Sequence, residues 1–264
     1  MPLALQTFAT VKDADAALAT AGARYLGGGT LLVRAASEGD LSIGNFVRST
    51  DARLSRIEAN GEDVTLGASA TMAEIARRFG GSALGKAARS VGGPAIRNMA
   101  TVGGNLFAPA PYGDFAVMLL ALDATVETGE RAIPVETFLD QRQSHAGIVT
   151  AVRVRLPANA DIRFVKVSRI KPKGVSVLSI AALLETGTDG AVTKARIALG
   201  CMADRPIRAK AAEAALTGAR LTAEGIAAAA AAIGEGTSPI TDAIASGWYR
   251  GEVLPVHFRR LLLG

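Results

Sequence analysis

The sequence predicts an α+β protein of two domains with a boundary near residues 157–160. The chain has 264 residues, which is longer than one small core requires, and 49% of them are hydrophobic, enough to form a sizeable core. Three long strand candidates follow the boundary and precede a run of alanine-rich helices, an order typical of an α+β domain. We therefore predict one domain over residues 1–158, divided into two subdomains near 55–60, and a smaller domain over 160–264 with a three-stranded sheet plus helices.

Local signals define the elements of the first domain. Thr10 and Asp13 form a helix N-cap pattern before an alanine-rich segment that Gly22 is placed to end. Thr71 and Glu74 form a capping box that begins a second helix. The other predicted elements are strands at residues 24–26, 63–66 and 152–156, a helix at 115–122 that is buried on nearly all sides, and a hairpin at 125–135.

The second domain contains the longest predicted elements. Strands at residues 164–170, 175–185 and 192–200 precede helices at 206–216, 222–233 and 241–263. Pro255 is expected to interrupt the last helix, because proline lacks the N–H donor and its ring clashes with the preceding turn. Trp248 and Tyr249 either close the core or contact a partner subunit, and we favour the core.

Composition excludes several classes of function. Cys201 is the single cysteine, so the chain has no internal disulfide and no cysteine-ligated zinc or iron–sulfur site. The charge of +5 is scattered and only 5% of residues are aromatic, which argues against nucleic-acid binding. No apolar run reaches the length of a membrane span, and residues 1–9 lack the pattern of a signal peptide. We expect no membrane insertion and a cytoplasmic protein, with export alongside a signal-bearing partner as the alternative.

Two glycine-rich segments carry the strongest functional signal. The first reads Tyr25-Leu26-Gly27-Gly28-Gly29-Thr30-Leu31-Leu32; the second reads Ala100-Thr101-Val102-Gly103-Gly104-Asn105-Leu106, followed by Pro109, Pro111, Gly113 and Asp114. Glycine lets the backbone approach a phosphate closely, exposed N–H groups bind its oxygens, and a threonine hydroxyl adds a donor. Two such loops could clamp one dinucleotide.

A tight turn is the stronger interpretation of either glycine segment taken alone. Neither segment matches the Rossmann pattern, and neither ends in the Lys-Ser/Thr of a P-loop. The glycines by themselves therefore leave nucleotide binding open.

In this order, the two segments resemble the FAD-binding (medium) subunit of the xanthine dehydrogenase and carbon monoxide dehydrogenase family of molybdenum hydroxylases. The resemblance continues through Leu119-Leu120-Ala121-Leu122-Asp123-Ala124 and through Phe164-Val165-Lys166-Val167-Ser168-Arg169. It implies a two-subdomain FAD-binding domain of the PCMH/vanillyl-alcohol-oxidase type, followed by a C-terminal domain of the CO dehydrogenase flavoprotein type. The chain departs from the family at Leu31, where many relatives have a polar residue, and at Ile170-Lys171-Pro172-Lys173-Gly174, where an acidic residue is frequent.

The resemblance also implies which residues bind FAD. Residues 26–32 and 101–105 would line the pyrophosphate, and apolar residues at 91 and at 148 or 149 would pack on the flavin, although such residues are more often simple core. It implies no catalytic and no metal-binding residue in this chain. The implied cofactor-binding residues are Tyr25, Leu26, Gly27, Gly28, Gly29, Thr30, Leu31, Leu32, Val91, Ala100, Thr101, Gly103, Gly104, Asn105, Gly113, Asp114, Ile148 and Lys166.

Two charged residues receive specific roles from the resemblance. Asp114 would accept hydrogen bonds from the ribityl or ribose hydroxyls of FAD, for which a carboxylate is suited; its alternative role is to cap the helix that follows. Lys166 would lie close to the isoalloxazine, where a cation stabilises the reduced flavin. On spacing alone, Lys166 is a solvated strand lysine.

The resemblance further implies partners. A large subunit would bind the molybdenum cofactor, a small subunit would bind two [2Fe-2S] clusters, and FAD on this chain would deliver electrons to NAD, a quinone or O2, within a dimer of heterotrimers. Two alternatives remain: a stand-alone FAD-dependent oxidoreductase of the same fold group, and a flavin-free binding or assembly module. The first needs its own acid–base residues, of which the sequence, with two histidines and three tyrosines, offers no convincing set.

Overall fold

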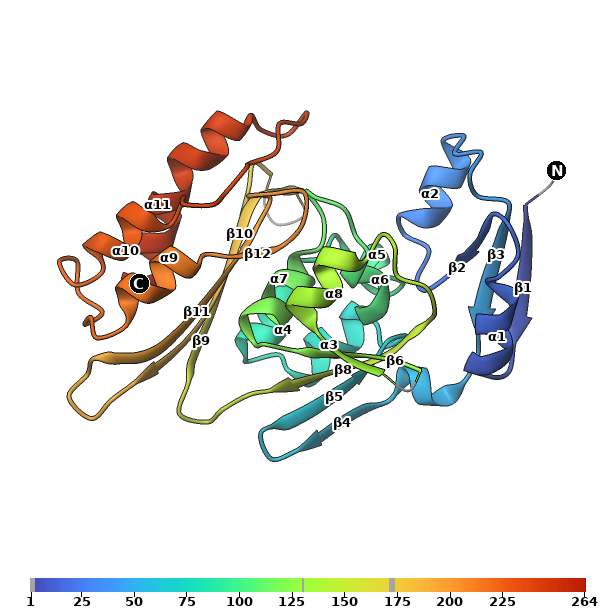
Figure 1. The fold of residues 1–264 in the computed structure, drawn as a ribbon, viewed down its shortest axis with the longest axis horizontal. Helices are drawn as coiled ribbons and strands as arrows, with labels where there is room; N and C mark the ends of the chain where they lie inside the picture. Colours follow the sequence, from blue (N-terminus) through green and yellow to red (C-terminus); the bar gives the residue numbers. More distant parts are fainter. Residues whose placement is uncertain (1–2, 130, 171–173) are drawn as a thin grey trace.

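The computed structural model describes residues 3–129, 131–170 and 174–264. Three β-sheets follow one another along the long axis of the molecule, in the order of the chain (Figure 1). Within the described residues, no helix combines the length and the apolar character that crossing a membrane requires.

The first sheet is parallel, with strand order β1-β3-β2. Parallel neighbours need crossover connections, and α1 and α2 lie in the two that join these strands. Thr10 caps α1 as predicted, because its hydroxyl accepts a hydrogen bond from the Asp13 amide at 3.1 Å. The bounds are β1 (Ala4–Phe8), α1 (Val11–Ala17), β2 (Ala23–Tyr25), α2 (Leu32–Ser37) and β3 (Asn45–Ser49).

The central sheet is antiparallel, in the order β4-β5-β8-β6-β7. Helices cover one of its faces (Figure 1). Thr71 and Glu74 form the predicted capping box at the start of α3. The bounds are η1 (Ala52–Ser55), β4 (Ile57–Asn60), β5 (Asp63–Gly67), α3 (Met72–Arg78), α4 (Ala83–Ser90), α5 (Pro94–Arg97), α6 (Val102–Leu106), α7 (Asp114–Ala121), β6 (Thr125–Thr128), β7 (Arg131–Pro134), α8 (Val135–Gln141) and β8 (Val149–Arg155).

The C-terminal sheet has the order β12-β11-β10-β9. The sequence predicted three strands, but Ile207 and Arg208 form a fourth, where a helix was expected to begin. The Ala209 amide donates to the Ile197 carbonyl, so strand pairing continues up to the start of α9. The bounds are β9 (Asp161–Ser168), β10 (Ser176–Thr186), β11 (Val192–Gly200), β12 (Ile207–Arg208), α9 (Lys210–Leu216), α10 (Ala227–Ala232) and α11 (Gly247–Leu263).

Helix α11 corrects two further predictions. It continues through Pro255 without a break and begins at Gly247, later than expected. Its buried face repeats every four residues, at Arg250, Leu254, Phe258 and Leu262. The polar contacts of Arg250 before the proline and the apolar packing of Phe258 and Leu262 after it keep both sides of the proline in one helix. Because Arg250 takes the inward position, Trp248 and Tyr249 face outward with 74% and 45% of their surface exposed, and the core interpretation is wrong.

Helix α7 joins the central and C-terminal parts of the protein. All its residues are buried, which confirms the helix predicted to be buried on nearly all sides. It contacts β10 and β11, and one core cluster contains residues of α7 together with Ala181, Leu183 and Ala198 of the C-terminal sheet. The N-terminal end of α7, which carries Asp114, therefore lies where the two parts meet.

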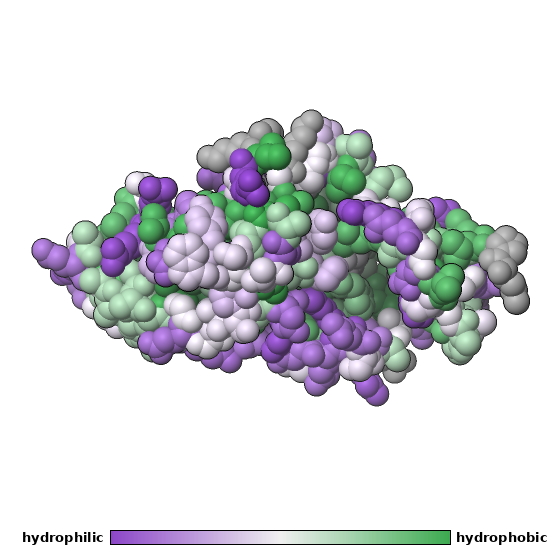
Figure 2. All heavy atoms as spheres, turned by 90° about the horizontal axis from the view of Figure 1, so that it is seen from above, coloured by the Kyte–Doolittle hydropathy of each residue, from purple (hydrophilic) through white to green (hydrophobic). Residues whose placement is uncertain are grey.

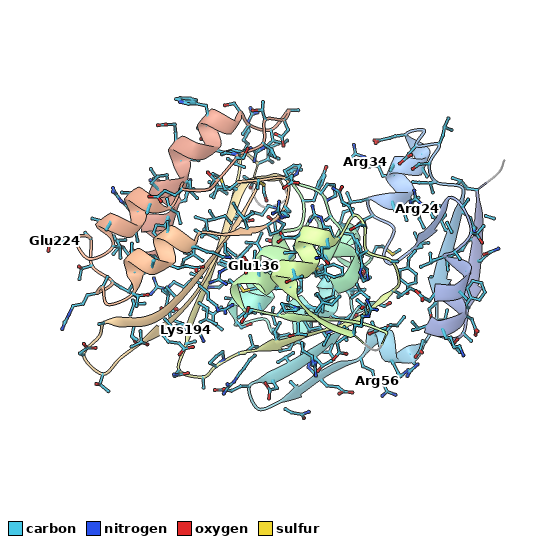
Figure 3. The ribbon with its side chains drawn as sticks, in the orientation of Figure 1. Arg24, Arg34, Arg56, Glu136, Lys194 and Glu224 are labelled. Atoms are coloured by element: carbon cyan, nitrogen blue, oxygen red, sulfur yellow. The ribbon has the colours of Figure 1, made fainter. Side chains whose placement is uncertain are left out.

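Charged and apolar side chains are spread over the surface. Arg24, Arg34, Arg56, Lys194 and Glu224 project from all three parts of the chain (Figure 3). On the face seen in Figure 2, hydrophobic side chains lie in several groups between hydrophilic ones.

Candidate cofactor-binding site

The two glycine segments pack directly against each other. A Cβ atom on Gly27 would lie 2.9 Å from Thr101 Oγ1, and one on Gly28 would lie 1.7 Å from the Met99 carbonyl oxygen. Gly103 packs against Ala68, which directly follows β5, with 3.0 Å between a built Cβ and the Cβ of Ala68. Side chains are therefore excluded from these positions, and the two loops meet backbone to backbone.

A cavity of about 390 Å³ opens where the loops meet. The end of β3 and the start of η1 form its opposite wall. At that wall, the Arg53 guanidinium holds the pKa of Asp51 at about 2, so this carboxylate stays ionised but paired. The lining residues are Leu26, Gly27, Gly28, Arg48, Ser49, Thr50, Asp51, Ala52, Ser55, Ser69, Thr71, Asn98, Met99 and Thr101.

The first glycine loop has unbonded backbone donors. The Leu26 amide still belongs to the sheet, donating to the Val47 carbonyl at 2.7 Å. The amides of the next five residues, 27–31, have no acceptor within the part of the chain that the structure describes. Successive unpaired N–H groups beside a cavity form an anion-binding concavity, because each needs an acceptor from water or a ligand.

The second glycine loop differs in this respect. The Val102 amide donates to Ala70 O at 2.9 Å, and the Gly103 amide donates to Ala68 O at 2.8 Å. The Gly104 amide donates to Thr101 Oγ1 at 3.1 Å. The N–H groups of residues 102–104 are therefore already engaged, and the part of this loop that lines the cavity is Thr101.

Asp114 does not cap α7, so that alternative is wrong. Gly113 is the N-cap, in the left-handed region at φ 91°. The Asp114 side chain turns toward the C-terminal sheet, where Oδ2 lies 2.9 Å from Lys166 Nζ and Oδ1 accepts a 2.6 Å hydrogen bond from Ser176 Oγ. Lys166 also donates to the Ser90 carbonyl at 2.9 Å. With side-chain exposures of 11% for Lys166 and 7% for Asp114, the solvated-lysine interpretation is wrong as well.

The remaining predicted residues fall into three places. Val91 is the C-cap of α4, directly after the carbonyl that Lys166 binds. Asn105 Oδ1 accepts from the Ala116 amide at 2.8 Å and so stabilises the first turn of α7. Ile148 packs in a separate small core beside α1. Like Ile148, the side chains of Val91, Asp114 and Lys166 do not line the cavity. Lys171, Pro172 and Lys173, where the sequence departs from the family, lie outside the described residues.

Tyr25 lies behind the cavity wall. Burial raises the pKa of Tyr25, and hydrogen bonds with Ser49 and Ser69 oppose that effect. Sequence reasoning missed both serines, along with Ser90 and Ser176, because their partners are distant in the chain. Ser49 could have been inferred only from the pairing of β3 with β2, the strand that leads into the first glycine loop.

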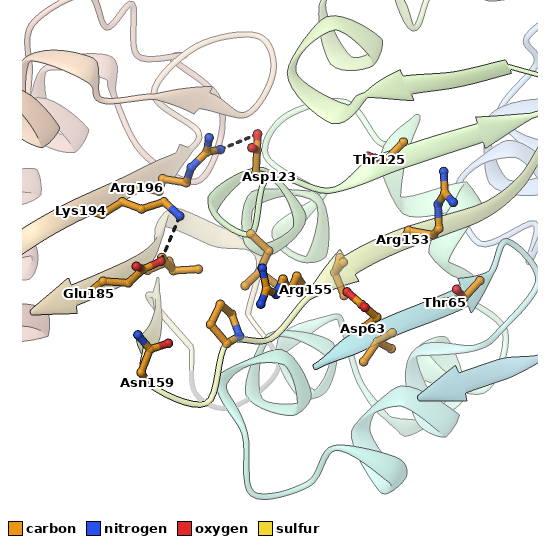
Figure 4. Close-up of a pocket in the computed structure, with 15 residues that line it drawn as sticks. Asp63, Thr65, Asp123, Thr125, Arg153, Arg155, Asn159, Glu185, Lys194 and Arg196 are labelled. Atoms are coloured by element: carbon orange, nitrogen blue, oxygen red, sulfur yellow. Dashed lines mark hydrogen bonds and ion pairs between the residues drawn. The ribbon is translucent and has the colours of Figure 1, made fainter. Parts of the chain in front are cut away.

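A larger cavity, of about 780 Å³, lies between the central and C-terminal sheets (Figure 4). Most of the charged side chains that line it already have partners: Lys194 lies 2.9 Å from Glu185, and Arg196 pairs with Asp123. None of the predicted cofactor-binding residues lines it, and it lies at the opposite end of α7 from Asp114. We therefore assign the cofactor to the smaller cavity at the glycine loops.

Cys201 should be unreactive in the folded protein. Burial raises the pKa of this thiol to about 12, and the Asp114 carboxylate adds to the effect, so at pH 8 the nucleophilic thiolate is scarce. We expect negligible reaction with a thiol reagent at pH 8 and one equivalent after unfolding in urea. Rapid labelling of the native chain would contradict this. Because the unfolded thiol ionises first, stability should fall as the pH rises from about 9 toward 12.

Comparison with known proteins identifies this arrangement. Residues 2–158 match the family model described as the FAD binding domain in molybdopterin dehydrogenase. The chain belongs to this family. Residues 163–264 match the CO dehydrogenase flavoprotein C-terminal domain. The resemblance predicted from the two glycine segments is confirmed.

Relatives agree with the family assignment. The FAD-subunit of nicotinate dehydrogenase from Eubacterium barkeri is 33% identical over 64% of this chain and 62% of its own length. Subunit alpha of the 6-hydroxypseudooxynicotine dehydrogenase complex from Paenarthrobacter nicotinovorans is 31% identical over 68% of this chain and 63% of its own. The matches thus span less than two thirds of these relatives.

Solved structures share the fold. A carbon monoxide dehydrogenase from Hydrogenophaga pseudoflava aligns with a TM-score of 0.89 at 24% identity, covering 98% of this chain and 96% of that chain. Quinoline 2-oxidoreductase from Pseudomonas putida 86 gives 0.86 at 22% identity, covering 100% of this chain and 96% of that one. These likenesses confirm the fold class.

The residues present fit the cofactor of the family. The run of unbonded amides that begins with Gly27 and Gly28 at the cavity, together with the Thr101 hydroxyl, suits the oxygens of a pyrophosphate. The tight packing of Gly27 and Gly28 leaves the backbone bare at the cavity. A FAD-binding domain of this kind is an oxidoreductase component that supplies a flavin site.

Proposed function

We propose that this chain is the electron-transfer flavoprotein of a molybdenum hydroxylase complex. The unbonded amides of residues 27–31 carry this proposal, because Gly27 and Gly28 at the start of that run line the cavity together with Thr101. They would bind the pyrophosphate of FAD, and Thr101 would donate a further hydrogen bond. Bound FAD would supply the redox chemistry.

The chain's own residues position and electrostatically support the cofactor. The cofactor-binding residues predicted from the sequence are retained, except that Ile148 is assigned to the core. Asp114 accepts from cofactor hydroxyls, and Lys166 provides a positive charge that its contacts with Asp114 and Ser90 hold in place. Val91 presents an apolar surface next to this pair.

The partners belong to the same proposal. A small subunit with [2Fe-2S] clusters delivers electrons, a large subunit binds the molybdenum cofactor and the substrate, and NAD, a quinone or O2 accepts electrons from this chain. The complex is a dimer of heterotrimers in the cytoplasm. We also propose that the family-model matches mark two domains, over residues 1–158 and 160–264.

An absorbance spectrum of the purified chain, alone and co-expressed with its genomic neighbours, tests the proposal. We expect a flavin spectrum, release of FAD on denaturation, and co-purification of iron and molybdenum with the neighbours. FAD without any metal-bearing partner would favour the stand-alone oxidoreductase. Failure to bind added FAD, both as the folded chain and in the assembled complex, would favour the flavin-free module.

A further inference from the structure

Asp114 belongs to the first domain, but its side chain is held by the second. Lys166 lies on β9 and Ser176 begins β10, and these two strands are neighbours in the C-terminal sheet. Each contacts a different carboxylate oxygen: Lys166 Nζ is 2.9 Å from Oδ2 and Ser176 Oγ is 2.6 Å from Oδ1. The two contacts together fix the plane of the carboxylate, which neither would do alone.

Ser176 is itself rigidly supported. Its side chain is fully buried, and its carbonyl oxygen accepts a 3.1 Å hydrogen bond from Arg250 Nη1 of α11. Arg250 is also fully buried and is paired with Asp242 at 2.7 Å. The Ser176 hydroxyl is therefore presented to Asp114 from a backbone that cannot easily move, as the supporting residues of a precise site require.

The contact is of a strong kind. A hydroxyl that donates to a carboxylate makes a short, charge-assisted bond, and a hydrogen bond to a charged group contributes more than one between neutral groups. Asp114 is nearly inaccessible to water, so water does not readily replace a lost donor. Without the Ser176 hydroxyl, the Asp114 carboxylate could rotate about its Cβ–Cγ bond, and only the contact with Lys166 would orient it.

We propose that Ser176 is a positioning residue for FAD binding, which acts by fixing the orientation of the Asp114 carboxylate. The C-terminal domain thereby contributes Ser176, as well as Lys166, to a cofactor site whose glycine loops belong to the first domain. This inference rests on the proposed FAD-binding function.

The test is FAD affinity of the full-length apoprotein, measured by quenching of flavin fluorescence. Ser176→Ala should raise the Kd about tenfold, the size expected for losing one hydrogen bond to a charged group. Ser176→Thr, which keeps the hydroxyl, should bind nearly as the unmodified chain does. Ser179→Ala is the matched control: Ser179 lies on the same strand, is fully buried, and its hydroxyl has no partner among the described residues, so its Kd should not change.

A double-mutant cycle shows whether Ser176 acts through Asp114. In an Asp114→Ala background, Ser176→Ala should cause no further loss of FAD affinity. Thermal unfolding of each apoprotein sets a temperature at which all variants are folded, so a stability loss alone leaves the Kd unmoved. The inference is overturned if Ser176→Ala binds FAD like Ser179→Ala, or if it weakens binding equally without Asp114. If the unmodified chain binds no FAD, the proposed function itself fails, which is a separate result.

Discussion

Replacing Gly28 with alanine is expected to abolish FAD retention. The added Cβ would lie 1.7 Å from the Met99 carbonyl oxygen, 2.5 Å from its carbon and 3.1 Å from Ala100 Cα. All three are backbone atoms, so no rotamer change relieves the clash and the two loops must separate. Separation displaces the unbonded amides of residues 27–31 from Thr101, and overpacking of this kind costs about 1–3 kcal/mol of stability.

The measurement is the ratio of flavin to protein after purification, together with the thermal midpoint of the apoprotein. Gly81→Ala provides the control, because a Cβ at Gly81 meets nothing within 4 Å; its flavin content and midpoint should match the unmodified chain. Full flavin occupancy in Gly28→Ala would show that the contact between the loops does not organise the cofactor site.

The glycine loops could be predicted from sequence because their signal is local. Consecutive glycines beside threonine are visible in a short segment, and their order along the chain carried the family resemblance. Whether an amide has a hydrogen-bond partner depends on residues that are distant in the sequence. The Gly103 amide has one only because α6 begins beside Ala68. The same limit applies to Ser176, which meets Asp114 across 62 positions of sequence.

Missed elements have similar physical causes. Strand β1 (Ala4–Phe8) is almost entirely exposed, so it lacks the alternation of buried and exposed residues by which strands are recognised. Its stability comes from pairing with β3, in which each residue lies 41 positions later in the sequence than its partner in β1, as Asn45 does for Ala4. In contrast, α3 and the long strands of the C-terminal sheet have strong local patterns, and both were predicted at nearly their observed positions.

The prediction that Asp114 caps α7 was wrong because the sequence pattern of a helix cap also fits a residue with a different role. An acidic residue before an apolar run normally predicts a helix cap. Gly113, which precedes Asp114, adopts the left-handed conformation at φ 91° at little energetic cost. Gly113 is therefore the N-cap residue of α7. This shift of one position leaves the Asp114 carboxylate free for Lys166 and Ser176.

Replacing Lys166 with methionine should destabilise the folded chain by about 3–5 kcal/mol, because removal of one partner leaves Asp114 as a buried, uncompensated charge. Methionine keeps the unbranched apolar stem, so the loss reports the charge and not the packing. Chemical denaturation of the apoprotein measures it. Arg153→Met serves as the comparison. Arg153 forms an ion pair with Glu127, and its side chain is 54% exposed. Surface pairs of this kind contribute only about 0–1 kcal/mol, so this variant should lose little stability.

Combining Lys166→Met with Asp114→Asn separates charge from shape. The double variant has no buried charge at this position, so it should recover most of the stability that Lys166→Met loses. The bound flavin gives a second readout. Lys166→Met leaves a lone carboxylate near the cofactor, which disfavours the reduced, anionic flavin and should make its midpoint potential more negative; the double variant should return the potential toward its original value. A Lys166→Met protein that is as stable as the unmodified chain, with an unchanged potential, would mean that the pair neither supports the domain junction nor reaches the flavin.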